Sequence, residues 1–171
     1  MTISKQGSSS NWIRHARDVV LAALVISAIV YWQTKDMLSS DGSVGVVQQN
    51  LVSLEGEVLP LLVEGKPNLI YFFAPWCTIC ALSIDNLEYL NSDKINVVVV
   101  ALDYSSEQEV QQFVEEHQVL AKVLMGHDAL KAQFQIQGYP SYYVISEEGV
   151  VSSRAFGYST ALGLKLREAF Q

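Results

Sequence analysis

The sequence predicts an α/β domain that follows an apolar segment near the N-terminus. Along residues 51–171, β-branched or aromatic runs of strand length alternate with stretches that carry apolar residues at helical spacing. Two cysteines, Cys77 and Cys80, lie where one of these strands meets one of these helices. Strands that alternate with helices are typical of a central sheet covered by helices.

The N-terminal apolar segment has the composition of a membrane span. Residues 19–34 carry no charged side chain, although sixteen residues fall just short of the roughly 20 that cross a bilayer. Basic residues, among them Arg14 and Arg17, precede the segment, and Tyr31 and Trp32 close it as candidates for an interfacial belt. The segment is apolar on every face, which argues against the buried helix of a soluble protein.

Two interpretations of this segment are a cleaved signal peptide and a retained signal anchor. The tripeptide at 28–30 ends in valine rather than in a small residue, so we favour the anchor. We predict a cytoplasmic segment at 1–17, a single-pass transmembrane anchor at 18–34 and a linker at 35–50. The positive-inside rule then exports the domain at 51–171, which in a bacterium means an inner-membrane protein with its domain in the periplasm.

The exported part of the chain is acidic. From residue 36 onward there are 17 acidic and 7 basic side chains, within an overall net charge of −7. No basic patch is evident, so we expect no nucleic-acid partner.

Several strands and helices are expected in the domain. The strands are expected at 51–54, 58–59, 69–74, 95–102, 123–124, 142–145 and 150–156. The first two form a hairpin, as do the last two. The run at 95–102 is β-branched and suits a strand buried on both faces.

Three helices are expected between these strands and a fourth after the last strand. The first, at 78–90, places Cys80, Ile84 and Leu87 on one stripe. The others are expected to start at three caps: Ser106, which forms a capping box with Glu109, then Asp128 and Thr160. In the helix after Ser106, the inward residues are expected to be Val110, Phe113 and Val114, with His117 at the edge of the core. In the helix after Asp128 they are expected to be Leu130 and Phe134. In the helix after Thr160 they are expected to be Leu162, Leu166 and Phe170.

The cysteine pair is the main functional signal. Cysteines three positions apart on the first helical turn share one face at a separation that permits a disulfide. Such a bond encloses only Thr78 and Ile79, and so small a ring constrains the unfolded chain little. A bond that stabilises the fold little favours a redox role over a structural one.

Metal binding is the other interpretation of the pair. Structural zinc takes about four Cys or His ligands at paired spacings, whereas His15, His117 and His127 form no such set with the two cysteines. Ala81 follows Cys80, which excludes attachment of a c-type haem. We therefore expect no resident metal and no cofactor.

The two cysteines are expected to differ in role. Cys77 lies where unpaired N–H groups and the helix dipole favour an anion, so we expect a lowered pKa for its thiol and assign it as the exposed, attacking cysteine. Cys80, one turn further, is expected to be buried and to resolve the mixed disulfide. Trp76 either offers a flat contact surface beside the sulfur or packs in the core.

A second feature is Gly138-Tyr139-Pro140-Ser141, placed before an expected strand. A proline there must lie at a turn or a strand start, because it has no N–H for a ladder. An aromatic residue before proline raises the cis fraction. We predict a cis Tyr139-Pro140 bond within contact distance of the Cys77 sulfur.

With Trp76-Cys77-x-x-Cys80 after a strand and Tyr139-Pro140 about sixty residues later, the chain resembles the thioredoxin superfamily. The extra helix and strand between 106 and 125, the N-terminal hairpin and the anchor resemble the TlpA/ResA branch, including the ScsD-like membrane-anchored periplasmic oxidoreductases. The resemblance covers about residues 50–170. It implies a thioredoxin-like fold, with a mixed central sheet and helices on both faces.

The chain departs from the family pattern at four positions, one of them Tyr139, which stands before the proline where the family often carries Thr or Val. Tyr71 stands where thioredoxins carry a buried aspartate, and Ser83 stands where ResA-like proteins carry a glutamate. Asp85 stands where a proline usually kinks the helix. The resemblance implies that Trp76, Tyr139 and Pro140 form the substrate groove beside Cys77.

The function expected from these features is that of an enzyme, a periplasmic thiol–disulfide oxidoreductase acting on protein cysteines. The resemblance favours a role as a reductant of substrate disulfides, with electrons supplied by a membrane thiol reductant. The alternatives are a disulfide-forming oxidant served by a membrane oxidant, and a non-catalytic Cu(I)-binding protein that uses two soft thiolates. The absence of Met or His next to Cys77 argues against copper.

Overall fold

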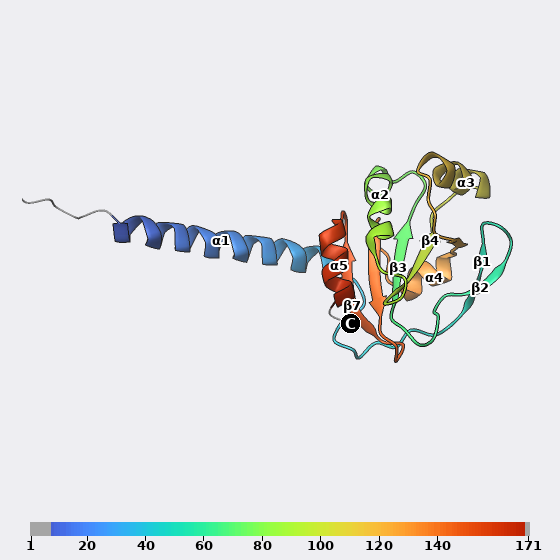
Figure 1. The fold of residues 1–171 in the computed structure, drawn as a ribbon, viewed down its shortest axis with the longest axis horizontal. Helices are drawn as coiled ribbons and strands as arrows, with labels where there is room; N and C mark the ends of the chain where they lie inside the picture. Colours follow the sequence, from blue (N-terminus) through green and yellow to red (C-terminus); the bar gives the residue numbers. More distant parts are fainter. Residues whose placement is uncertain (1–7, 170–171) are drawn as a thin grey trace, which may run out of the picture. The chain divides into compact units, whose positions relative to one another are not determined.

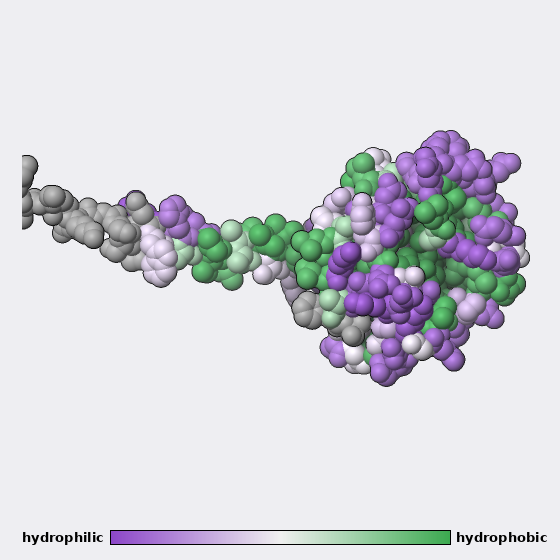
Figure 2. Space-filling view, in the orientation of Figure 1, coloured by the Kyte–Doolittle hydropathy of each residue, from purple (hydrophilic) through white to green (hydrophobic). Residues whose placement is uncertain are grey.

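The structure is a computed structural model that describes residues 8–169, and it divides into two compact units that part after Lys35. The first unit consists of one helix, α1 (Ser8–Thr34) (Figure 1). Within the described residues, the stretch Arg14–Thr34 is the one helix long and apolar enough to cross a membrane. Its apolar side chains are exposed and follow one another along the helix (Figure 2).

The second unit is built on a seven-stranded mixed sheet (Figure 1). Its strands are β1 (Asn50–Ser53), β2 (Val58–Pro60), β3 (Asn68–Phe73), β4 (Asn96–Ala101), β5 (Val123–Met125), β6 (Ser141–Ile145) and β7 (Val151–Phe156). They lie in the order β2-β1-β5-β4-β3-β6-β7. The three central strands β5, β4 and β3 are parallel, and the strands on either side of them run antiparallel. Every strand predicted from the sequence is present, which confirms the mixed sheet.

Helices cover both faces of the sheet, as the resemblance implied. They are α2 (Thr78–Ser83), the 3₁₀ helix η1 (Ile84–Tyr89), α3 (Glu107–Glu116), α4 (Asp128–Gln133) and α5 (Ala161–Ala169). One core cluster joins alternate β3 residues such as Tyr71 and Phe73 to α2, η1, α3 and α5. The other joins Ile70 and Phe72 to α4 and to the chain before β1. Because β3 is buried on both faces, its sequence is continuously apolar or aromatic after Asn68.

The segment predicted as a linker packs against the domain over much of its length. Arg154 of β7 donates from Nη1 to the carbonyl oxygens of Met37 and Leu38, at 2.7 and 2.6 Å. The Tyr143 hydroxyl accepts from the Leu38 N–H at 3.2 Å. The compact unit therefore begins at residue 36 rather than at 51.

Both edges of the sheet are protected from further pairing. Backbone hydrogen bonds from the Val46 N–H to the Gly149 carbonyl, at 2.8 Å, and from the Val151 N–H to the Val44 carbonyl, at 2.9 Å, cover the start of β7 on its outer side. At the other edge, the three-residue strand β2 ends at Pro60, which has no N–H to donate.

The helix predicted at 78–90 changes its hydrogen-bonding pattern at Ser83. Residues up to Ser83 are α-helical, and η1 continues as a 3₁₀ helix. The Ser83 hydroxyl donates back to the Cys80 carbonyl at 3.4 Å, a bond from side chain to backbone that competes with regular helix pairing. The predicted stripe is still buried, because Cys80, Ile84 and Leu87 are all at most 6% exposed.

Two details of the helix predictions are wrong. The cap of α4 is His127, whose Nδ1 accepts from the Leu130 N–H at 3.2 Å, while the expected cap Asp128 is the first helical residue. In α5 the buried residue is Leu164, whereas Leu162 and Leu166 are 69% and 51% exposed.

The reason for the second error is the alternating pattern of leucines in α5. Leucines at every second position do not determine which face packs on η1. Phe170 lies outside the described residues. The expected cap of this helix is confirmed, since Thr160 Oγ1 accepts from the Gly163 N–H at 3.1 Å.

Candidate active site

Strand β3 delivers the cysteine pair to one end of the sheet. After Phe73 the chain turns, and the Cys77 N–H donates to the Ala74 carbonyl at 3.0 Å. Cys77 has extended backbone angles, φ −85° and ψ 103°, and is the N-cap of α2. The predicted location of the pair, at a junction of strand and helix, is confirmed.

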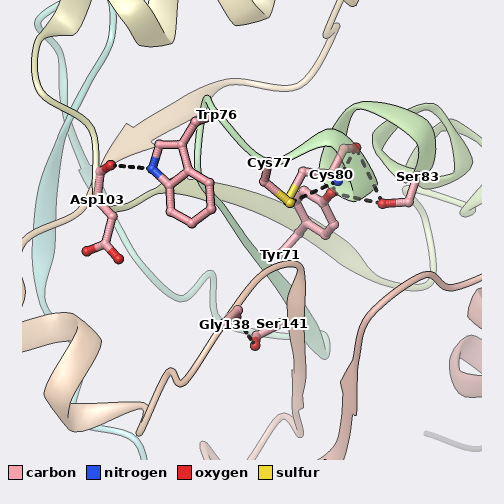
Figure 3. The surroundings of a disulfide bond; sticks show 8 residues. All are labelled: Tyr71, Trp76, Cys77, Cys80, Ser83, Asp103, Gly138 and Ser141. Carbon is pink, nitrogen blue, oxygen red and sulfur yellow. Dashed lines mark hydrogen bonds between the residues drawn. A yellow bond between two sulfur atoms is a disulfide. The ribbon is translucent and has the colours of Figure 1, made fainter.

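The two cysteines form a disulfide with a Cα–Cα distance of 5.2 Å (Figure 3). The Cys80 N–H also donates to Cys77 Sγ at 3.1 Å. A charged acceptor strengthens a hydrogen bond, so the same N–H would favour a thiolate on Cys77 once the bond is reduced.

Both sulfurs are largely shielded in this oxidised state. Cys77 is 7% exposed and Cys80 is fully buried. The expectation of an exposed Cys77 is therefore wrong for the disulfide form, because α2 and the neighbouring core residues cover the bond. The predicted order holds, since Cys77 is the cysteine that reaches the surface.

Next to Cys80 lie two hydroxyls, of Tyr71 and Ser83, at the positions where the family pattern has carboxylates (Figure 3). The Tyr71 hydroxyl donates to the Cys80 carbonyl at 3.2 Å and lies 3.1 Å from Ser83 Oγ. Burial, followed by the neighbouring Tyr142, raises the pKa of Tyr71 far above its usual value, so its hydroxyl stays protonated. Among the described residues, no carboxylate or imidazole hydrogen-bonds to Cys80.

Two aromatic side chains stand beside the cysteine pair. The rings of Trp76 and Tyr139 meet edge to face, with centroids 5.7 Å apart and an interplanar angle of 81°. Trp76 is 65% exposed, so the interpretation that it packs in the core is wrong, and its indole is a surface feature. Trp76 directly precedes Cys77 and Tyr139 directly precedes Pro140, so this contact brings the two sequence motifs together.

The Tyr139-Pro140 peptide bond is cis, as predicted. The loop around it is closed by Ser141 Oγ, which donates to the Gly138 carbonyl at 2.8 Å. The proline itself is buried, and its carbonyl accepts from the Gly157 N–H at 2.8 Å. In Figure 3 the labelled residues Gly138 and Ser141 lie on the loop that faces the disulfide.

Sequence reasoning missed Asp103, which follows β4 in the loop before α3. Its backbone carbonyl accepts from the Trp76 indole N–H at 2.9 Å, and its carboxylate accepts from Lys131 Nζ at 2.6 Å. The predicted sheet did contain an indication of this contact. Since β3 and β4 are parallel neighbours, the loops at their carboxyl ends lie at one edge of the sheet, which places the loop of Asp103 beside the loop of Trp76.

A shallow groove of about 250 Å³ lies beside Trp76. It is lined by Pro75 and Trp76 and, from α3, by Phe113, Glu109 and Glu116. Figure 2 shows hydrophilic side chains gathered over α3. The part of the chain that the structure describes holds no group of three or more His, Cys, Asp or Glu side chains suited to a metal ion.

Comparison with known proteins agrees with this geometry. The sequence profile of the AhpC/TSA family matches residues 51–154. The thioredoxin-like protein YneN of Bacillus subtilis is 29% identical over 117 residues, which are 65% of this chain and 69% of that protein.

Two solved structures show the same fold. StoA from Bacillus subtilis has a TM-score of 0.63 at 20% identity, covering 70% of this chain and 95% of StoA. The exposed lipoprotein thioredoxin Etrx1 from Streptococcus pneumoniae has a TM-score of 0.66 at 19% identity, covering 73% of this chain and all of Etrx1. At these identities the likeness concerns the fold alone.

Fold, relatives and cysteine pair together define a thioredoxin-like thiol–disulfide oxidoreductase. The chain belongs to the AhpC/TSA family. The expected thioredoxin-like class is therefore confirmed.

Proposed function

We propose that this protein is a membrane-anchored oxidoreductase that reduces disulfides of protein substrates outside the cytoplasm. The observation that carries the proposal is the disulfide between Cys77 and Cys80 at the N-terminus of α2, with Cys77 nearer the surface. A pair that forms a disulfide at the surface end of a rigid sheet can exchange two electrons with another dithiol.

In the proposed reaction the Cys77 thiolate attacks one sulfur of a substrate disulfide. A mixed disulfide forms, and one substrate thiolate leaves and takes a proton. The Cys80 thiolate then attacks Cys77 Sγ, which closes the Cys77–Cys80 disulfide and releases the second substrate thiolate. Two electrons pass to the substrate, and a membrane dithiol returns the pair to its reduced form.

Trp76, Tyr139 and Pro140 are proposed to hold the substrate chain. The two aromatic rings offer apolar area beside Cys77, and the groove next to Trp76 provides room for a chain. Since proline lacks an N–H, an extended substrate can pair with backbone groups next to Pro140, as in strand addition.

The proposed location is the bacterial inner membrane, with the domain in the periplasm. It is supported by the apolar stretch Arg14–Thr34 and by the basic residues before it. Protein disulfides form and persist in such an oxidising compartment.

The test of this function uses the reduced full chain in detergent with insulin as the disulfide substrate and no added metal. We expect insulin reduction by the wild type, none by Cys77→Ser, and a trapped mixed disulfide through Cys77 in Cys80→Ser. Failure to reduce insulin, together with tight Cu(I) binding by both thiolates, would instead support the copper-binding alternative.

The direction of exchange is tested by the reduction potential of the pair. A value near that of thioredoxin, about −270 mV, supports a reductant. A value near that of DsbA, about −120 mV, would overturn the reductant and support the oxidant alternative.

A further inference from the structure

Three loops from different parts of the chain meet beside the disulfide. Trp76 lies between β3 and α2, Asp103 lies between β4 and α3, and Tyr139 lies between α4 and β6. An edge-to-face contact joins the two aromatic residues. The Trp76 indole N–H donates a hydrogen bond to the Asp103 carbonyl (Figure 3). Asp103 thus contacts Trp76, the neighbour of Cys77 in the chain, and makes no hydrogen bond to either cysteine.

The backbone of Asp103 fixes the indole of Trp76. Its φ of +48° lies in the left-handed region, which Asp tolerates better than most residues. The preceding residue is held to β3, since the Leu102 N–H donates to the Phe73 carbonyl at 2.8 Å. Because Trp76 is 65% exposed, packing alone restrains its ring little, and the 2.9 Å bond to the Asp103 carbonyl supplies the orientation.

The carboxylate of Asp103 lies near the second aromatic residue, Tyr139. Its carboxylate is held by Lys131 of α4, in a pair whose side chains are about one third exposed. Burial and then the Asp103 carboxylate raise the pKa of Tyr139. The Tyr139 hydroxyl makes no hydrogen bond of normal geometry to the described residues, and the Asp103 carboxylate lies near enough to raise its pKa both as a potential acceptor and as a charge.

We propose that Asp103 is a positioning residue that sets the orientation of Trp76 and Tyr139 and thereby controls the recognition of protein disulfides. This inference rests on the proposed function. It assigns two separable tasks, one to the left-handed backbone of Asp103 and one to its carboxylate. Cys77 reacts with small disulfides independently of this arrangement, because such molecules need no aromatic contact surface.

Three substitutions separate the two tasks. Asp103→Gly keeps the left-handed backbone and removes the carboxylate. Asp103→Asn tolerates the same backbone and removes only the charge. Asp103→Ala removes the carboxylate and also disfavours the left-handed backbone. Glu107→Gln, an exposed carboxylate four residues further on, is the matched control.

The kinetic test compares two substrates for the reduced full chain in detergent. With insulin we expect all three Asp103 variants to raise KM by about 5-fold while kcat stays within about 2-fold, the size expected for one lost polar contact. With oxidised glutathione as the small disulfide we expect unchanged rates. Glu107→Gln should match the wild type on both substrates.

The second readout is the ¹⁹F NMR signal of 5-fluorotryptophan at residue 76, assigned by Trp76→Phe. We expect Asp103→Ala to move this signal toward that of a freely rotating indole, while Asp103→Gly leaves it in place.

A wild-type KM for insulin in both Asp103→Asn and Asp103→Gly would overturn the role of the carboxylate. An unmoved signal in Asp103→Ala would overturn the role of the backbone. Lower thermal stability with an unchanged KM would show a merely structural residue and overturn the proposal. Failure of the wild type itself to reduce insulin would refute the proposed function instead, and the NMR result would still report on Trp76.

Discussion

Two buried tyrosines next to Cys80 offer a test of how hydrogen bonds support the site. Tyr71 and Tyr142 are both fully buried, and their rings meet edge to face with centroids 5.0 Å apart. The Tyr71 hydroxyl donates to the Cys80 carbonyl and contacts Ser83, whereas the Tyr142 hydroxyl has no hydrogen-bond partner among the described residues. Burial raises the pKa of Tyr142, and the nearby hydroxyls of Ser83 and Ser159 offset part of that rise without reaching hydrogen-bond geometry.

Replacing each tyrosine by phenylalanine removes one hydroxyl and leaves the ring. A typical intramolecular hydrogen bond contributes about 1 kcal/mol net, and an orphaned buried partner costs about 1–3 kcal/mol. In Tyr71→Phe the Cys80 carbonyl keeps the Ile84 N–H as a partner, so we expect a loss of about 1 kcal/mol in the free energy of unfolding. In Tyr142→Phe no bond is lost, and we expect a change between zero and a stabilisation of about 1 kcal/mol.

The assay is urea unfolding of the oxidised full chain in mild detergent, followed by near-UV circular dichroism. Ser83→Ala and the double variant with Tyr71→Phe complete a double-mutant cycle, and we expect less than additive losses because the two hydroxyls share one contact. Equal destabilisation by Tyr71→Phe and Tyr142→Phe would refute the reasoning, since it would show that the recorded hydrogen bonds do not distinguish the two hydroxyls.

Three further predictions concern other parts of the chain. In the reduced protein at slightly acidic pH, iodoacetamide should label Cys77 before Cys80, because only Cys77 reaches the surface; mass spectrometry showing the reverse order would contradict the assigned roles. An alkaline-phosphatase fusion after Ser40 should be active and stay in the membrane fraction, whereas a soluble product starting near residue 35 would show a cleaved signal. Burial raises the pKa of Tyr143 to about 12, so the free energy of unfolding should be constant below pH of about 10 and should fall between about 10 and 12. Tyr143→Phe should reduce that fall, and an unchanged alkaline profile in urea titrations would contradict the assignment.

The sheet and the cysteine pair could be predicted because their signals are local. The β-branched run before Leu102 and the aromatic run before Ala74 identify strands buried on both faces. The cysteines follow one of these runs directly, and Pro140 precedes another strand. Such patterns reflect backbone requirements that every sequence with this fold must meet.

The remaining features depend on contacts between distant parts of the chain. Asp103 gains its role from Trp76, 27 positions earlier, and from Lys131, 28 positions later. Nothing near Ser83 in the sequence indicates that Tyr71 lies beside it and that the helix changes its pairing there. The buried face of α5 is decided by η1, and the leucine pattern alone fits either face.

The hydrogen bonds from Arg154 to the carbonyls of Met37 and Leu38 also determine how mechanical force would enter the domain. Force applied to the chain before residue 36 reaches the carbonyls of Met37 and Leu38 first, and they transmit it to β7 through the guanidinium. The bonds that join residues 44–46 to the β7 hairpin then share the load along the sheet edge. Strand β1 would carry tension only after these contacts break. The end of the sheet that carries Cys77 would therefore bear little of a force applied at the N-terminal side. In single-molecule extension, Arg154→Ala should show a lower first unfolding force than the wild type.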